Sequence, residues 1–255
     1  MSVEREAGSD WIHPDWPAPR NVGALMTTRN GGFSTGPYAG DDQSGGLNLG
    51  ARCGDDARHV AANRALLRAR VPADPFWLWQ VHGCAVVDAA SAEIEPEADA
   101  AIASSPDRVC AVLVADCMPV LFCDRHGTRV AAAHAGWRGL ARGVLEATVA
   151  AFDVPPADVL AWLGPAIGPQ HFEVGDDVRD AFLGHDRAAA AAFAALGKGK
   201  WLADLEALAR RRLAACGVHA VFGGGLCTVS ELERFYSFRR DRVTGRMAAL
   251  IWLRV

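Results

Sequence analysis

Residues 109–140 read VCAVLVADCMPVLFCDRHGTRVAAAHAGWRGL, and this stretch decides the fold. It contains three apolar runs, each bounded by turn residues and typical of a buried strand: Val109–Ala115, Pro119–Cys123 and Arg129–His134. A turn at Gly136 leads into a helix that we expect over Arg138–Phe152. Because these three strands follow one another without a helix between them, strands and helices do not alternate strictly, and the pattern favours a mixed sheet over a doubly wound fold.

The flanking sequence predicts three more strands and three more helices. We expect strands over Trp77–Val81, Val159–Leu163 and Met247–Leu253. We expect helices over Asp55–Arg70, Ala188–Ala195 and Leu202–Cys216. Residues 27–50 are rich in Gly, Asn, Ser and Asp and are expected to form one long loop. The sequence therefore predicts an α+β fold, a compact single domain over residues 21–255 with a mixed β-sheet and flanking helices, after an N-terminal extension over residues 1–20.

Composition excludes several classes of protein. The 255 residues carry a formal net charge of −4, which gives no general attraction for nucleic acid or for anionic membranes. The first twenty residues lack the apolar segment of a secretory signal, and the most apolar run, Val109–Cys123, is too short and too polar to span a membrane. Seven cysteines without a CxxC pair fit a reducing compartment, so we expect a cytoplasmic protein.

Three short segments carry residues suited to metal binding. They are WQVHG with His82, ADCMP with Cys117 and AHAGWRG with His134, and each places its His or Cys at the end of a predicted strand. Two imidazoles and one thiolate suit Zn²⁺, and three protein ligands leave the fourth position open, as in catalytic zinc sites. The spacing matches no local zinc signature, so the residues alone leave a second interpretation open, in which Cys117 fills the core and the histidines occupy turns.

An anion site is expected beside these residues. Arg138 lies in the first turn of a predicted helix directly after His134, where helix amides and a guanidinium together suit an anion. Arg239 and Arg240, in FYSFRRD, could add positive charge, although an exposed strand edge is an equal interpretation. The glycine-rich segment 30–50 lacks both GxGxxG and GxxxxGK[ST] and is weak evidence for phosphate binding.

Taken together, the motifs resemble those of the laccase-domain (YfiH-like) family, also called the purine nucleoside phosphorylase or polyphenol oxidase family. The matching stretches run in the family's order from about Thr27 to the C-terminus: TTRNGGFSTGPY, NLG, GDDARHVAANR, WLWQVHG, ADCMPVLF, AAHAGWRGL, GPAIGPQHFEVG, DL, CT, RFYSFRRD and TGRMAALIW. The resemblance implies that residues 21–255 form a laccase-like catalytic domain of α+β fold. It also implies that His82, Cys117 and His134 are zinc ligands.

The resemblance implies several activities. Family members are described as cleaving adenosine, inosine and methylthioadenosine with phosphate, as deaminating adenosine, as oxidising phenols with copper and as editing peptidoglycan precursors. The chain has 8 histidines but no His-x-His pair, which argues against a four-copper centre, although Cu²⁺ could still occupy a site built for Zn²⁺. We therefore expect small-molecule partners, a nucleoside and phosphate, and neither nucleic acid nor a membrane.

Roles for further residues follow as hypotheses from their motifs. Deamination needs a carboxylate that moves a proton, for which Asp116 and Glu173 are candidates. Phosphorolysis needs arginines for the phosphate. The arginine candidates are Arg29, Arg138 and Arg239. Gln80 and Asn48 are the candidates for binding ribose or base.

Two other classes of function compete with a zinc nucleoside enzyme. Cys117 could be a nucleophile activated by His82 or His134 in a hydrolase that acts on a cell-wall precursor. Alternatively, the zinc could be structural in a binding module, whose fold would then be lost on chelation. The sequence does not predict the oligomeric state.

Overall fold

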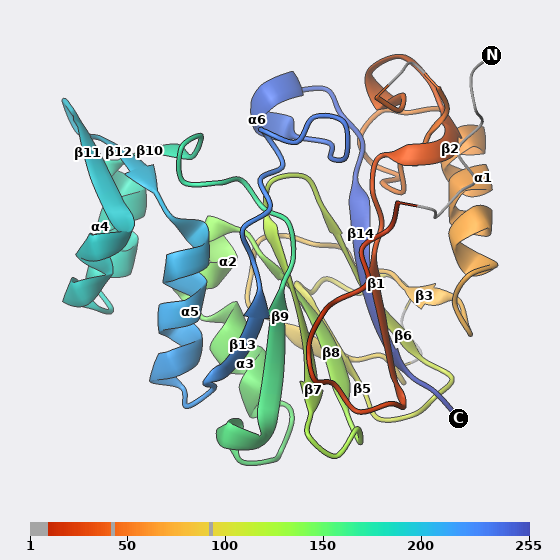
Figure 1. The fold of residues 1–255 in the computed structure, drawn as a ribbon, viewed down its shortest axis with the longest axis horizontal. Coiled ribbons are helices and arrows are strands. Elements are labelled where there is room, and N and C mark those ends of the chain that lie inside the picture. The colour runs from red at the N-terminus through yellow and green to blue at the C-terminus, as the bar shows by residue number, and fades with distance from the viewer. Residues whose placement is uncertain (1–9, 42–43, 92–93) are drawn as a thin grey trace.

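The strands of the computed structural model form three sheets, which confirms the α+β class (Figure 1). The model describes residues 10–41, 44–91 and 94–255, so residues 1–9 of the predicted extension and 42–43 of the predicted loop lie outside it. The strands are β1 (Val22–Met26), β2 (Asn30–Ser34), β3 (Pro75–Phe76), β4 (Val86–Asp88), β5 (Ala100–Ala103), β6 (Val109–Val114), β7 (Met118–Asp124), β8 (Val130–Ala135), β9 (Val159–Leu163), β10 (Glu173–Gly175), β11 (Phe193–Gly197), β12 (Lys200–Ala203), β13 (Ala220–Gly223) and β14 (Met247–Leu253).

The helices flank the two larger sheets. They are α1 (Ala57–Arg68), α2 (Trp137–Arg142), α3 (Val144–Ala150), α4 (Asp176–Leu183), α5 (Leu205–Ala215) and α6 (Phe238–Asp241), with short 3-10 helices η1 (Gly36–Tyr38), η2 (Pro156–Asp158) and η3 (Arg187–Ala192). In Figure 1, α1 lies on one side of the sheets, and α2, α3, α4 and α5 lie on the other.

Both larger sheets are mixed. The six-stranded sheet has the order β13-β9-β7-β8-β5-β4, with parallel pairs at its two edges and antiparallel pairs in its middle. The four-stranded sheet has the order β1-β14-β6-β3, in which only β3 and β6 run parallel. A small antiparallel sheet has the order β10-β12-β11. The predicted single sheet is therefore divided, and β14 belongs to a different sheet from β7.

Alternating residues of β7 explain why the sequence there is apolar without interruption. Val120 and Phe122 face the core that α2, α3 and α5 cover, whereas Leu121 and Cys123 face the core between the two larger sheets. Every residue of β7 is buried, as expected for a strand covered on both faces. A third apolar cluster lies between the outer face of the four-stranded sheet and α1, and it includes Trp11.

Two predicted helices differ from the structure. The helix expected over Arg138–Phe152 is broken into α2 and α3 at Gly143, whose φ of 99° is a left-handed conformation that ends a helix. The helix expected over Ala188–Ala195 is instead η3 followed by β11. There Phe193 is buried and opens a strand that pairs with β12, so tertiary packing outweighs the helix propensity of alanine.

Three further segments were predicted incompletely. The expected loop over residues 27–50 contains β2 and η1. The strand expected over Trp77–Val81 is present only as the two-residue β3 just before it, with an isolated bridge at Trp79. Within the predicted N-terminal extension, Ile12 pairs with Met26, the last residue of β1.

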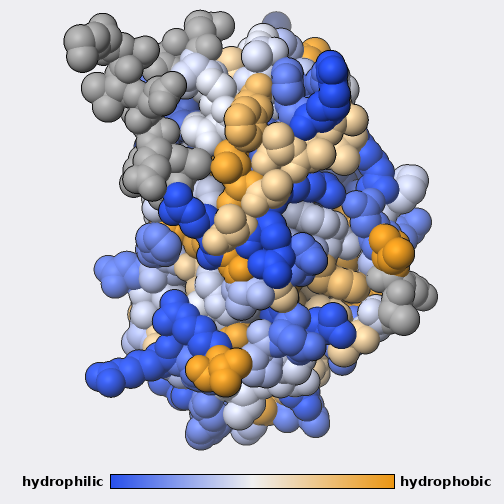
Figure 2. Space-filling view, turned by 90° about the vertical axis from the view of Figure 1, so that its right-hand side faces the viewer, coloured by the Kyte–Doolittle hydropathy of each residue, from blue (hydrophilic) through white to orange (hydrophobic). Residues whose placement is uncertain are grey.

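Apolar side chains of the described residues form neither a membrane-spanning helix nor a broad patch on the face around α1 (Figure 2). Among the described residues, no helix has both the length and the apolar character needed to cross a bilayer. Figure 2 shows the side on which α1 lies, and its coloured part is mostly hydrophilic, with a narrow apolar band and isolated apolar spots.

Candidate metal centre and active site

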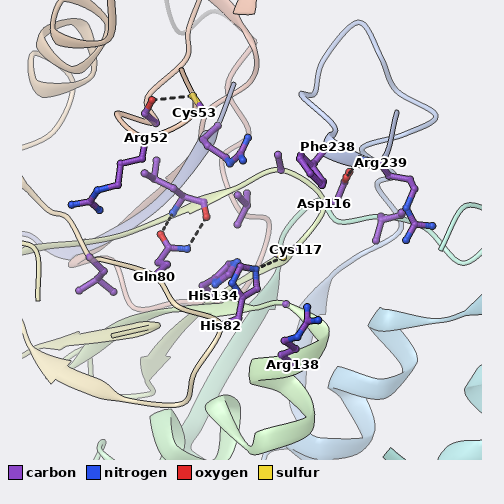
Figure 3. Close-up of a pocket in the computed structure, with 18 of the residues that line it drawn as sticks. Arg52, Cys53, Gln80, His82, Asp116, Cys117, His134, Arg138, Phe238 and Arg239 are labelled. Carbon is purple, nitrogen blue, oxygen red and sulfur yellow. Dashed lines mark hydrogen bonds between the residues drawn. The ribbon is translucent and has the colours of Figure 1, made fainter. Parts of the chain in front are cut away.

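The three predicted metal ligands meet at the end of the six-stranded sheet. Cys117 directly precedes β7, and His134 lies in β8 opposite Pro119 in the antiparallel register. His82 reaches the same place from the turn that precedes β4. The ligand atoms of the three side chains lie within 4.8 Å of one another, and Cys117 Sγ lies 3.8 Å from His82 Nε2 (Figure 3).

A glycine makes room for this cluster. A Cβ atom at Gly136 would lie 2.8 Å from Cys117 Sγ and 2.9 Å from His82 Cδ2, which is closer than non-bonded atoms approach. Gly136 has a φ of −66°, so its backbone does not require glycine, and the requirement is one of space alone. The residue also caps α2, which carries Arg138 beside the cluster.

Backbone strain is concentrated around the cluster. Six non-glycine residues in the described part of the chain have a positive φ, and four of these line the cavity at the cluster: His82 (59°), Glu95 (48°), Asp116 (81°) and Arg242 (62°). Such conformations cost free energy and persist where the surrounding structure imposes them, which is frequent at functional sites.

A buried aspartate that the sequence analysis did not identify joins two of the candidate ligands. Asp99 directly precedes β5 and is fully buried. Its Oδ1 lies 2.8 Å from His134 Nδ1, and its two carboxylate oxygens accept the backbone N–H groups of Val81, His82 and Gly83. Burial alone would raise the pKa of Asp99, but the hydrogen bonds from His134 and the backbone hold it below its usual range. An acidic residue opening the apolar run ADAAIA was the available signal.

The cluster without a metal is a thiolate–imidazolium pair. Burial would raise the pKa of Cys117, but the charges and hydrogen bonds of His134 and His82 outweigh it and lower the pKa to about 6. Burial would lower the pKa of His134, but Cys117 and Asp99 outweigh it and raise the pKa to about 9. Two imidazoles and a thiolate at this separation form a donor set that fits Zn²⁺.

The cluster lies in a cavity of about 550 Å³, which is within the usual range for small-molecule sites. Six arginines and two carboxylates are among the residues that line it: Arg52, Arg64, Arg138, Arg239, Arg242, Arg246, Glu95 and Asp116. Arg52 and Arg64 pair with Glu95. The cavity therefore has an excess of positive charge, although the chain as a whole is acidic.

Two of these arginines have no polar partner among the residues that the structure describes. Arg138 stacks on Trp137, and Arg242 lies near the Phe238 ring. Within the described part of the chain, neither guanidinium makes a hydrogen bond or an ion pair. In Figure 3, Arg138 lies on α2 just below the cluster. Arg242, which sequence analysis missed, follows the predicted Arg239 and Arg240 in the chain and could have been found by its charge.

Of the other predicted site residues, four line the cavity: Gln80, Asp116, Arg138 and Arg239. Gln80 uses its amide to bind both the N–H and the C=O of Leu113 in β6, which fixes the segment leading to His82. Asp116 accepts hydrogen bonds from Thr228 Oγ1 and from the backbone N–H of Arg239. These contacts join the start of β7 to the C-terminal part of the chain.

The remaining predicted residues, Arg29, Asn48 and Glu173, do not line this cavity. Arg29 donates to the carbonyl oxygens of Ala39 and Leu232. Asn48 is fully buried, its amide nitrogen donates to Gly50 and Asp55, and its oxygen accepts the backbone N–H groups of Gly50 and Arg246. Glu173 pairs with Lys200, which lowers its pKa. The structure thus brings together the metal-ligand candidates and four of the seven other predicted residues.

Comparison with known proteins places this fold and cluster in a family. Residues 23–254 match the family model described as multi-copper polyphenol oxidoreductase laccase. The chain is 53% identical to a purine nucleoside phosphorylase of Pseudomonas aeruginosa over 244 residues, covering 95% of this chain and 98% of that relative. It is also 53% identical to purine nucleoside phosphorylase YfiH of Escherichia coli, covering 96% of this chain and 99% of that relative.

Solved structures give the same result. A Neisseria meningitidis protein, NMB0706, superposes with a TM-score of 0.92 at 53% identity, covering 96% of this chain and 99% of that protein. YlmD of Geobacillus stearothermophilus superposes with a TM-score of 0.86 at 28% identity, covering 99% of both chains. The chain therefore belongs to the laccase-like family of YfiH proteins, whose model carries the multi-copper polyphenol oxidoreductase description.

Proposed function

We propose that this chain is a zinc-dependent purine nucleoside phosphorylase of the cytoplasm, which cleaves adenosine, inosine and methylthioadenosine with phosphate and deaminates adenosine as a side activity. One observation carries the proposal: the metal-ligand candidates line the same cavity as Arg138 and Arg242, two arginines that have no polar partner among the described residues. Relatives at 53% identity along nearly their whole length are named purine nucleoside phosphorylases.

The donor set supports one zinc ion rather than several copper ions. In the described part of the chain, His82, Cys117 and His134 are the one group found that could hold a metal. A centre of several coppers needs more imidazoles than this group supplies. When bound, zinc would supply a Lewis acid that polarises a substrate oxygen or water at the cavity floor.

Phosphate would be held by the chain's own cations. Arg138 projects from the first turn of α2 and lines the cavity beside the cluster (Figure 3). Arg242 adds a second guanidinium whose N–H groups are not used within the described chain. A planar guanidinium can donate two parallel hydrogen bonds to one phosphate.

Phosphorolysis breaks the bond between C1′ of ribose and the purine nitrogen and forms a bond between C1′ and a phosphate oxygen. The leaving base must take up a proton. Asp116 is the proposed proton carrier, because Glu95, the other cavity carboxylate, is already paired with Arg52 and Arg64. Arg239 forms the adjoining wall, with its side chain fixed by the carbonyl oxygens of His171 and Glu173.

The test is chromatographic product analysis of adenosine with zinc-loaded protein, with and without phosphate. Free adenine and ribose 1-phosphate that appear only with phosphate are the expected products. Inosine that appears regardless of phosphate would instead make deamination the main reaction. If a zinc-loaded protein formed neither product, the proposed function would be wrong.

The proposed phosphate site has a matched control on the same helix. We expect Arg138→Ala and Arg242→Ala each to raise the KM for phosphate by about tenfold to a hundredfold, the loss of about one to two charge-assisted hydrogen bonds. Arg142 is exposed, lies in α2 and does not line the cavity, so Arg142→Ala should leave this KM unchanged. An unchanged KM in Arg138→Ala would remove that residue from the phosphate site.

A second function is favoured by one specific observation. Cys117, His134 and Asp99 follow one another through close contacts, as in a cysteine hydrolase in which the aspartate orients the histidine. The hydrolase would act on a cell-wall precursor without a metal. Iodoacetamide labelling of Cys117, mapped by mass spectrometry, separates the two functions: zinc that both protects Cys117 and supports turnover favours the phosphorylase, whereas zinc that inhibits turnover favours the hydrolase.

A further inference from the structure

Asp99 makes an unusual number of contacts for one buried side chain. Both carboxylate oxygens are fully used: Oδ1 accepts from His134 Nδ1 at 2.8 Å and from the backbone N of His82 at 3.0 Å. Oδ2 accepts from the backbone N of Val81 at 3.1 Å and from that of Gly83 at 2.6 Å. Its backbone oxygen also accepts the N–H of His134 at 2.7 Å. A single residue thus contacts two of the three candidate ligands.

We propose that Asp99 is the positioning residue of the metal centre, which fixes His134 with Nε2 free for the metal and holds the turn that presents His82. The inference rests on the zinc ion of the proposed function. It assigns a role to a residue that neither the sequence motifs nor the ligand set includes.

The orientation of His134 follows from the chemistry of the contact. An ionised carboxylate can only accept hydrogen bonds, so Nδ1 of His134 must carry a proton to bind Asp99. That leaves Nε2 as the nitrogen able to bind a metal, on the side of the ring that faces Cys117. Outer carboxylates of this kind orient metal-binding histidines in many proteins.

The His82 turn depends on the same carboxylate. His82 has a φ of 59°, a left-handed conformation that is uncommon for any residue other than glycine. Three successive backbone N–H groups, from Val81 to Gly83, point at Asp99 and form a concave anion site. The negative charge offsets the strain and sets where the His82 ring lies.

Asp99→Asn is the most informative substitution, because asparagine keeps the size of the side chain and replaces one acceptor with a donor. If its amide nitrogen takes the place of Oδ2, it faces the N–H groups of Val81 and Gly83, and the turn loses its acceptor. If the nitrogen takes the place of Oδ1, it faces Nδ1 of His134, which then must accept, so the proton moves to Nε2. Either orientation disturbs one ligand of the metal.

Asp124 provides a matched control in the same sheet. It is also fully buried, at the end of β7, and its carboxylate accepts the backbone N–H groups of His126, Thr128 and Arg129 and the hydroxyl of Thr128. It lies at the opposite end of β7 from Cys117. Asp124→Asn should therefore destabilise the fold about as much as Asp99→Asn without touching the metal centre.

The experiment measures zinc dissociation constants by competition with a chromophoric chelator, in wild type, Asp99→Asn and Asp124→Asn, beside urea unfolding of each metal-free protein. We expect Asp99→Asn to bind zinc about 10–100-fold more weakly and Asp124→Asn to bind it as wild type does. Zinc affinity within twofold of wild type in Asp99→Asn, or an equal loss in Asp124→Asn, would overturn the proposal. A wild type that binds no zinc would overturn the proposed metal itself, which is a separate outcome.

Nitrogen NMR of histidine-labelled, zinc-loaded wild type tests the same inference without a substitution. We expect His134 to show a proton on Nδ1 and a metal bound to Nε2. A metal on Nδ1, or an Nδ1 without a proton, would contradict the assignment even if Asp99→Asn failed to fold.

Discussion

Two buried polar regions of this molecule differ in whether their side chains still have atoms available to bind a ligand. Beside the glycine-rich segment, Asn63 of α1 donates to Ser34 Oγ and to the carbonyl oxygens of Gly46 and Asn48, and its own oxygen accepts the N–H of Phe33. At the proposed metal centre, Cys117 and two imidazoles face one another and line the cavity. The first region is closed by its own hydrogen bonds, whereas the second keeps the capacity to bind something else.

The comparison shows why residue type alone misplaces function. Asn48 and Arg29 have the chemistry of ligand-binding residues, but they form hydrogen bonds with other groups of the chain. Arg138 and Arg242 have the same chemistry and face a cavity. Zinc affinity tests the difference between the regions, because substitutions at the proposed metal centre should lower it and substitutions beside the glycine-rich segment should not change it.

The largest effect on zinc affinity is expected from loss of a ligand. Cys117→Ser replaces a thiolate with a neutral hydroxyl, so we expect zinc binding to weaken by more than the roughly 100-fold upper effect of an outer partner. Competition titration against a chelator measures it. Cys216, half-buried at the C-terminal end of α5 and outside the cavity lining, supplies the control Cys216→Ser, which should bind zinc as wild type does. Equal affinities in the two variants would show that Cys117 is no ligand.

A methyl group at the centre should have the next largest effect. Gly136→Ala places a Cβ against Cys117 Sγ and the His82 ring, so we expect a loss of zinc affinity of about tenfold to a hundredfold, similar to that from a disturbed outer partner. Gly184→Ala is the control, since Gly184 has a φ of −61° and the nearest atom to its Cβ would be 3.3 Å away. If Gly136→Ala bound zinc normally, the close contact would not restrict the centre.

Acidity should change zinc affinity by about tenfold per pH unit. Between pH 6 and 9 the metal-free centre holds ionised Cys117 and protonated His134, so a bound zinc ion must displace one proton. Affinity should rise with pH across this window, level off above about 9 and fall more steeply below about 6, where Cys117 is also protonated. Calorimetry in buffers of different ionisation enthalpy measures the released proton, and release of none at pH 7.5 would contradict the ion pair.

The same pair makes the stability of the metal-free fold depend on pH. The raised pKa of His134 stabilises the fold fully below its ordinary value of 6.5, and this contribution is lost as pH rises through about 9. The lowered pKa of Cys117 stabilises the fold above its ordinary value of 9, and this contribution is lost as pH falls through about 6. Both contributions act together only between these limits.

A substitution in the region closed by its own hydrogen bonds should have no effect on zinc affinity. Asn63→Ala removes one acceptor and three donated hydrogen bonds from a fully buried site, so the free energy of unfolding should fall by about 3 kcal/mol. Urea unfolding checks the stability, and chelator competition checks the affinity. A loss of zinc affinity in this variant would show that the two regions are coupled.

The positions of the central strands depend on the apolar pattern and could be predicted from the sequence. The pairing of the strands depends on distant parts of the chain and could not. The apolar runs placed β6, β7, β8, β9 and β14 nearly to the residue. The division into separate sheets was not predictable, because the pairing of β14 with β6 joins segments far apart in the chain. Phe193 illustrates the same limit locally, since its pairing with β12 overrides an alanine-rich helical pattern.

The site shows a similar division. The chemistry of two imidazoles and a thiolate, with the family resemblance, was enough to select three side chains that the fold brings together. Asp99 was missed because a lone aspartate before an apolar run is a weak signal, and its contact with His134 arises from the register of β5 against β8. Glu173 was selected for its charge, but that charge is neutralised by Lys200 outside the cavity.

The place of β14 has a consequence for synthesis of the protein. The last strand of the chain lies between β1, which is the first, and β6, and β14 is the only strand that β1 pairs with in the described sheets. Until β14 has left the ribosome, β1 therefore exposes an unpaired edge, a known route to aggregation. Arg239 and Arg242 also follow β13 in the chain, so neither the complete four-stranded sheet nor the complete cavity can form before this part of the chain has been made.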